Sequence, residues 1–299
     1  MSLLNVNDSL PAFLWATVRL LATTEHPYSV EKAKALLVPP PIEGEKGRAF
    51  SDAVSTLEDL KLVTSHENGM LELLGAARNL TGKKYGEFAK VLRDAVLDRS
   101  LNTEIGDNAS QLGPRDLCRA LSWFLTQDPT GPAFNWTSVQ QVQQGALSEE
   151  AGSLALINDT RWTRFTAWAP ALGFAAAALA TSNSASYLVP DCTAAVRQTI
   201  FLRWKPDTSL SSAELLRGLR EELPVLPGGE FSLAVGLPAP ADMSAGAALS
   251  HALLRGSEEG WLALERDADA RNLLLVHDPD RPDSPRAYST IKILKDLNV

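Results

Sequence analysis

Residues 46–73 read KGRAFSDAVSTLEDLKLVTSHENGMLEL, and this stretch decides the fold of the first part of the chain. Its first half has apolar residues at the i, i+3, i+4 and i+7 spacing of one helical face, namely Phe50, Ala53, Val54 and Leu57. Two short apolar segments, 61–66 and 69–74, follow on either side of a Glu-Asn-Gly turn. The pattern predicts a helix over 46–60 followed by a β-hairpin.

Two further helices are predicted ahead of this stretch. Residues 10–23 (LPAFLWATVRLLAT) have Pro11 in the first turn and an apolar face beyond it. Ser29 stands where an N-cap is expected for the helix VEKAKALLV, which the three prolines at 39–41 end. Three helices and a hairpin within so short a segment are typical of a winged helix-turn-helix. We therefore predict such a domain over residues 1–82.

The remainder of the chain predicts two more regions. Residues 83–186 indicate a helical middle domain, in which the alanine-rich stretch 167–180 is expected to be one buried helix, too short to span a bilayer. Residues 187–299 indicate a second winged-helix-like domain, with helices over 211–222 and 244–255 and a hairpin within 260–279. The two ends share no repeat in sequence. The predicted fold class is mainly α (α+β), with a winged helix-turn-helix, a helical middle region and a C-terminal winged-helix-like α/β-hairpin module.

Composition limits the function classes. Among 299 residues, 28 are Lys or Arg and 36 are Asp or Glu, which gives a net charge of -8. A protein that coats nucleic acid is usually basic, because neutralised phosphates supply most of the non-specific affinity. Any contact with DNA must therefore be local. The two cysteines lie far apart in the sequence and the N-terminus lacks the pattern of a signal peptide, so we expect a cytoplasmic protein with reduced thiols.

No motif for catalysis is found in the sequence. Phosphate-binding glycine loops, the nucleophile elbow and paired metal-ligand spacings are all missing. Aspartates at 267 and 269 and at 278, 280 and 283 could hold divalent ions in a nuclease, but they fall in a predicted turn and a proline-rich loop. We expect a protein that is not an enzyme, with no catalytic residue, no cofactor and no metal site.

The first domain offers candidate contacts with DNA. The third helix of a winged helix can enter the major groove, where basic and hydroxyl side chains meet phosphates and base edges. The candidate DNA-binding residues are Lys32, Lys34, Lys46, Arg48, Ser51, Ser55, Lys83 and Lys84. Carboxylates surround the same helix, at Glu43, Glu45, Asp52, Glu58 and Asp59. The sequence thus leaves two alternatives open, a weak contact with double-stranded DNA and the docking of another protein.

Aromatic residues concentrate in the middle region. The segment RWTRFTAW sets two arginines among two tryptophans and a phenylalanine. Tryptophan and arginine dominate the energetics of protein interfaces, which makes Arg161, Trp162, Arg164 and Trp168 candidate interface residues. The alternative is an aromatic helical core with arginines stacked on it.

Several strings resemble an accessory protein family known as DpdG. They are LLNVNDSLPAFLWATVRLL (3–21), RWTRFTAWAPALGF (161–174), SSAELLRGLREELPVLPGG (211–229) and LSHALLRGSEEGWLALERDADARNLLLV (249–276). The resemblance implies that the chain is encoded in the bacterial gene cluster whose products insert 7-deazaguanine derivatives into DNA. It also implies an antiviral, restriction-type defence complex with helicase, ATPase or nuclease subunits as partners.

The expected function is accordingly that of a non-catalytic DNA-engaging or scaffolding subunit of such a complex. The alternative is a free-standing winged-helix transcriptional regulator, although regulators of this class usually dimerise on palindromic half-sites. No long run of coiled-coil heptads indicates a dimerisation helix in this sequence.

Overall fold

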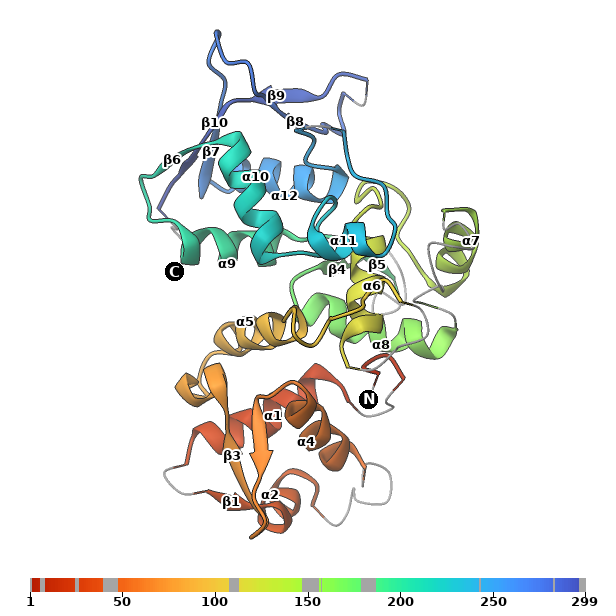
Figure 1. Ribbon diagram of the computed structural model, residues 1–299, viewed down its shortest axis with the longest axis vertical. Coiled ribbons are helices and arrows are strands. Elements are labelled where there is room, and N and C mark those ends of the chain that lie inside the picture. The colour runs from red at the N-terminus through yellow and green to blue at the C-terminus, as the bar shows by residue number, and fades with distance from the viewer. Residues whose placement is uncertain are drawn as a thin grey trace. The chain divides into compact units, whose positions relative to one another are not determined.

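The computed structural model describes residues 2–5, 9–24, 27–39, 48–107, 113–146, 156, 158–178, 187–241, 243–281 and 283–295. These residues form a mixed α/β structure in which strands build small antiparallel sheets (Figure 1). The chain divides into two compact units. Unit 1 comprises Met1–Glu104, Ala109–Leu117 and Asn158–Leu172, and unit 2 comprises Ile105–Asn108, Cys118–Ile157 and Gly173–Val299.

Unit 1 begins with six elements that we call the first module. They are α1 (Pro11–Ala22), β1 (Tyr28–Ser29), α2 (Val30–Leu37), α4 (Ala49–Asp59), β2 (Val63–Ser65) and β3 (Met70–Leu73). The three strands form an antiparallel sheet in the order β1-β3-β2. The predicted helices and hairpin are therefore present, and the short strand β1 is an addition that the sequence pattern did not indicate.

Local signals account for these elements. The side chain of Ser29 accepts a hydrogen bond from the backbone N–H of Lys32 at 3.2 Å, which is the expected N-cap of α2. The apolar face of α4 packs against α1, and Phe50, Ala53 and Leu57 are buried there together with Leu14 and Val18 of α1. The hairpin adds its own apolar residues to the same core. The residues that the helical periodicity predicts to be buried are therefore the ones that lie in the core of the first module.

The rest of unit 1 comes from later in the chain. The short 3-10 helix η1 (Gly75–Asn79) leads to α5 (Tyr85–Val96), and α8 (Asp159–Ala171) packs against α1. Helix α6 (Arg115–Phe124) begins in unit 1 and continues into unit 2. The predicted boundaries after residues 82 and 186 do not coincide with this division, because α5 and α8 bury their apolar faces in unit 1.

The alanine-rich stretch 167–180 is not one helix, which corrects the prediction. Helix α8 ends at Ala171, and Ala175–Ala177 form β4, which pairs with β5 (Leu188–Pro190). Gly173 has a φ of 81°, a conformation that only glycine adopts readily, and a Cβ there would lie 2.9 Å from the backbone nitrogen of Ala195. Close packing against α9 (Thr193–Arg203) therefore ends the helix where composition alone predicted that it would continue.

Unit 2 contains the remaining elements. They are α7 (Trp136–Ala146), β4, β5, α9, β6 (Ser209–Ser211), α10 (Ser212–Glu222), α11 (Glu230–Ala234), α12 (Ala247–Glu258), β7 (Leu262–Glu265), β8 (Leu274–Val276), β9 (Arg286–Tyr288) and β10 (Thr290–Ile293). Strands β6, β10 and β7 form an antiparallel sheet in the order β6-β10-β7. Strands β8 and β9 form a separate antiparallel pair.

Six of these elements repeat the plan of the first module. The succession α9, β6, α10, α12, β7, β10 matches α1, β1, α2, α4, β2, β3, and in both sheets the first strand pairs with the last. The junction of strand and second helix is also alike, because Ser211 caps α10 by accepting from the N–H of Glu214, as Ser29 caps α2. We call this set the second module. Helix α12 occupies in it the position that α4 occupies in the first.

The predicted hairpin within 260–279 is wrong in its pairing. Strand β7 pairs with β10, whereas β8 pairs with β9, so the two predicted strands do not contact each other as partners. Ile291 and Ile293 of β10 are fully buried, and this apolar face makes β10 the better partner for β7. The β8–β9 pair is inserted between the last two strands of the second module.

Among the residues described, no helix combines the length and the apolar character that crossing a membrane requires.

Candidate functional site

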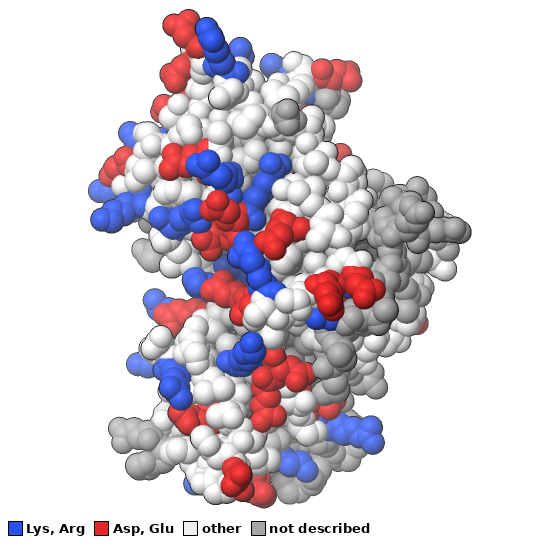
Figure 2. All heavy atoms as spheres, viewed as in Figure 1, with Lys and Arg blue, Asp and Glu red and all other residues white. Residues whose placement is uncertain are grey.

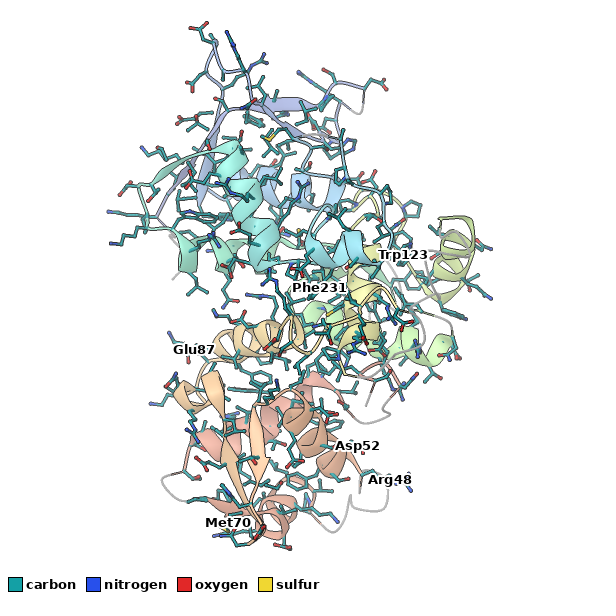
Figure 3. The ribbon with its side chains drawn as sticks, viewed as in Figure 1. Arg48, Asp52, Met70, Glu87, Trp123 and Phe231 are labelled. Carbon is teal, nitrogen blue, oxygen red and sulfur yellow. The ribbon has the colours of Figure 1, made fainter. Side chains whose placement is uncertain are left out.

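The exposed side of α4 is the candidate site, because the sequence predicts the reading helix there. Arg48 is the N-cap residue of α4 and is exposed, and Ser51 is exposed and donates its hydroxyl to the carbonyl oxygen of Arg48 at 2.9 Å. Ser55 is half-buried one turn further along. Figure 3 shows Arg48 and Asp52 together at the start of the helix. Lys46 lies outside the described residues.

Carboxylates dominate this helix. Helix α4 contains Asp52, Glu58 and Asp59 and no lysine or arginine. Asp52 in the first turn interacts favourably with the helix dipole. Glu58 accepts a hydrogen bond from the backbone N–H of Ser65 at 3.0 Å, which links the end of α4 to β2. The helix that would face phosphates therefore has acidic residues near both of its ends and no basic residue.

The two candidate lysines at 32 and 34 lie on α2, which precedes α4 in the chain. Helix α2 packs on α1 and β1. Lys32 is exposed, with its ammonium 5.0 Å from the centre of the Tyr28 ring in a cation–π contact, and Lys34 is half-buried. Lys32 is thus positioned by the aromatic ring that precedes its own helix.

The hairpin that follows α4 is close to neutral. Glu72 of β3 pairs with His66 at 2.8 Å and with Arg78 at 2.7 Å. The hydrogen bond from His66 and the charge of Arg78 lower the pKa of the Glu72 carboxyl. Figure 2 shows Lys and Arg interspersed with Asp and Glu over the face of unit 1 that is in view. This mixture differs from the basic stripe of a strong DNA-binding surface.

Lys83 and Lys84 lie away from α4. Both are exposed, and Lys84 is the N-cap residue of α5. Gly82 has a φ of 69°, and a Cβ at this position would lie 2.8 Å from Cγ2 of Thr23. The chain therefore packs closely against the end of α1 at this point. In Figure 3 Glu87, in the first turn of α5, lies on the opposite side of unit 1 from Arg48 and Asp52. The structure does not bring these two lysines together with Arg48.

The tryptophans predicted as an interface belong to the core of unit 1, which corrects that prediction. Trp162 is 3% exposed and Trp168 is 0% exposed. The ring of Trp162 stacks on Phe165 at 5.6 Å, and the indole N–H of Trp168 donates to the carbonyl oxygen of Ser9 at 3.0 Å. Both side chains are buried in the folded chain and are unavailable to a partner.

The arginines of the same segment are also held within unit 1. Arg161 is 2% exposed and its Nε–H donates to the side-chain oxygen of Asn5 at 2.8 Å. Arg164 is half-buried and donates to the carbonyl oxygen of Thr160 at 3.1 Å. Burial lowers the pKa of Arg161, while the charge of Asp116 opposes that effect.

Asp116 is a buried partner of Ser2, Leu4 and Arg161 that no sequence pattern indicated. It is 1% exposed, and its carboxylate accepts from the hydroxyl of Ser2 and from the backbone N–H of Leu4 at 2.9 Å. No local pattern marks it, because it stands in the first turn of α6, where aspartate is common for dipole reasons. Its role appears only when α6, α8 and the N-terminal segment meet.

A family model described as DpdG-like matches residues 1–270. The chain belongs to the DpdG-like family. The match covers the first module and extends through β7 of the second, and it confirms the resemblance seen in the four sequence strings. Membership links the chain to the Dpd DNA-modification system and to the multi-protein cluster of that system. No curated protein and no solved structure matches the chain.

The C-terminal aspartates of this DpdG-like chain are engaged in local bonds. Asp278 accepts from Nε of Arg286 at 2.7 Å, and Asp267 accepts from the hydroxyls of Ser289 and Thr290 at 3.2 and 3.3 Å. In the part of the chain that the structure describes, no three His, Cys, Asp or Glu residues are grouped so that they could hold a metal ion. These contacts give the two aspartates structural roles.

Proposed function

We propose that this DpdG-like chain is a non-catalytic adaptor of the Dpd system, built on two winged-helix modules that dock other proteins of the system. Support for the winged-helix assignment is the order helix, strand, helix, helix, strand, strand, with the first strand paired to the last. In DNA-binding proteins of this kind the third helix enters the major groove. Helices α4 and α12 stand at that position.

The observation that carries the docking role is the charge of α4. A helix that enters a groove of DNA lies between two rows of phosphates, and a carboxylate there is repelled at short range. Three carboxylates and no basic residue on α4 make that placement unfavourable. The exposed polar side of this helix is suited to contact a basic or neutral protein surface.

The experiment that tests this function is co-expression of the tagged full-length chain with the other proteins of the Dpd cluster. We expect at least one of them to remain bound through affinity and size-exclusion chromatography. A chain that instead elutes alone, as a dimer that binds palindromic duplex, would support the transcriptional-regulator alternative.

A separate assay tests the proposal that the chain is not catalytic. The purified chain, incubated with ATP or with plasmid DNA and magnesium or manganese, is expected to show no turnover. Turnover that disappears in the Asp267→Asn variant would contradict the proposal, because it would place metal-dependent chemistry at the C-terminal aspartates.

A weak contact with duplex DNA is the second candidate function. It is favoured by the exposed guanidinium of Arg48 beside the exposed hydroxyl of Ser51 at the N-terminus of α4. Backbone N–H groups and the dipole at a helix N-terminus also favour phosphate. Such a contact would neutralise few phosphates, so it would be weak, salt-sensitive and largely independent of sequence.

Two double variants separate the two functions. Lys46→Glu with Arg48→Glu reverses two charges in the sequence just before α4, and Lys83→Glu with Lys84→Glu makes the same change of net charge just before α5. We expect both to weaken binding of labelled duplex at low salt equally, by roughly tenfold or less, as a net-charge effect. Loss of binding in the first variant alone would establish the DNA contact at α4.

A further inference from the structure

A groove in unit 2 lies on α12, the counterpart of α4. Its volume is ≈ 460 Å³, and it is lined by the exposed side of α12, by Asp278, Pro279, Asp280 and Arg286, and by Thr130. We call it the α12 groove. Strand β8, which precedes Asp278 in the chain, packs against α12, and Arg286 is the first residue of β9. The groove is thus formed by the third helix of the second module and by the insertion that distinguishes this module from the first.

The cations of the α12 groove are already neutralised. Nε of Arg255 contacts Glu259 at 2.8 Å, and Nη1 of Arg255 contacts Asp191 at 3.1 Å. Nε of Arg286 contacts Asp278 at 2.7 Å. Guanidinium groups held by carboxylates in this way have little attraction left for phosphate. The groove is therefore not an anion site.

The remaining charge of the groove is negative. Four carboxylates line it, together with two guanidinium groups and the imidazole of His251. Glu258 and Asp280 are exposed, and within the residues that the structure describes neither carboxylate has an ion-pair partner. Leu254 and Pro279 add apolar surface between the charges. A ligand that complements this lining carries cations on either side of an apolar group.

We propose that the α12 groove binds a lysine- or arginine-bearing segment of a partner protein, with Glu258 and Asp280 receiving its cations and Leu254 contacting its apolar side chain. This inference rests on the adaptor role and assigns to it one surface and the chemistry of one partner. Duplex DNA is a poor occupant, because its phosphates would meet an excess of carboxylates. The binding is expected to weaken with salt, since both carboxylates are exposed.

Peptide binding to the full-length chain tests the groove. The probe is a fluorescein-labelled peptide in which arginines flank a leucine, compared with a peptide in which glutamates replace the arginines. Fluorescence anisotropy is expected to show binding of the first peptide only. The double variant Glu258→Gln with Asp280→Asn is expected to raise its Kd about tenfold, which corresponds to loss of roughly 1.4 kcal/mol.

A matched control makes the same chemical change elsewhere in unit 2. Glu214→Gln with Asp269→Asn removes two exposed carboxylates outside the groove and is expected to leave the Kd almost unchanged. Leu254→Lys provides a second groove variant. The lysine places a positive charge in the groove and should abolish binding of the arginine-bearing peptide. The melting temperature of this variant checks that it is folded. Equal Kd values for the groove variant and the control, or binding of both peptides alike, would overturn the proposal. So would duplex DNA that binds wild type and loses affinity in Leu254→Lys.

The failure of this inference is distinguishable from that of the adaptor role. In one outcome, the wild-type chain co-purifies with Dpd proteins, but the groove variants change neither the peptide Kd nor the co-purification. This result refutes the groove proposal and leaves the adaptor role in place. If the peptide binds as expected but no Dpd protein co-purifies, the adaptor role fails and the groove remains a site for basic segments.

Discussion

Replacement of Trp168 by alanine is expected to lower the free energy of unfolding of unit 1 by about 3–5 kcal/mol. The side chain is fully buried, and its indole N–H donates to the carbonyl oxygen of Ser9 at 3.0 Å. Alanine leaves a cavity and an acceptor without its donor, and both effects destabilise the folded state. Urea denaturation followed by circular dichroism measures the change.

Two controls accompany this variant. Trp168→Phe retains most of the apolar volume and loses the hydrogen bond, so its cost should be clearly smaller. Leu36→Ala removes a large apolar side chain that is 54% exposed on α2, and its effect should stay within about 0.5 kcal/mol. A Trp168→Ala protein that keeps its stability but loses co-purifying partners would restore the interface interpretation that the burial contradicts.

Removal of the buried carboxylate of Asp116 is expected to cost a similar amount, about 3–5 kcal/mol. The Asp116→Ala change deprives the hydroxyl of Ser2 and the N–H of Leu4 of their acceptor. It also removes the charge that offsets the buried guanidinium of Arg161. Asp116→Asn keeps the size and one acceptor atom and should cost about 1–3 kcal/mol. Asp98→Ala, at an exposed position of the same unit, serves as the control in the same urea titrations. Equal costs for Asp98→Ala and Asp116→Ala would contradict the role given to Asp116.

The Asp116 contribution should depend on pH in a defined direction. Burial raises the pKa of its carboxyl, although the bonds from Ser2 and Leu4 and the charge of Arg161 act against this. A carboxyl with a raised pKa in the folded state contributes stability that is complete below its unfolded pKa of about 3.9 and is lost as pH rises through the folded pKa. The stability difference between wild type and Asp116→Asn should therefore shrink with rising pH above that value. A difference that grows over this range would show that the pKa is lowered instead.

The first module shows what the sequence by itself determined. A serine followed by a helical pattern gave the cap of α2, the spacing of Phe50, Ala53 and Leu57 gave the buried face of α4, and a Glu-Asn-Gly turn gave the hairpin. Each of these signals acts between residues close in the chain, where a cap bond, a helical face or a tight turn forms without help from elsewhere. The candidate site on α4 and its excess of carboxylates follow from the same local information.

Tertiary structure decided the features that depend on partners distant in sequence. The segment RWTRFTAW is compatible with a core or with an interface, and only the tertiary packing of α8 decides that Trp162 and Trp168 are buried. Strand β7 could pair with β8 by its own pattern, but β10 offers the apolar face of Ile291 and Ile293. The equivalence of the two modules is likewise a property of strand order, which no repeat in sequence records. Which residues become buried and which strands pair depends on competition among all parts of the chain. A local sequence pattern therefore does not determine either of them by itself.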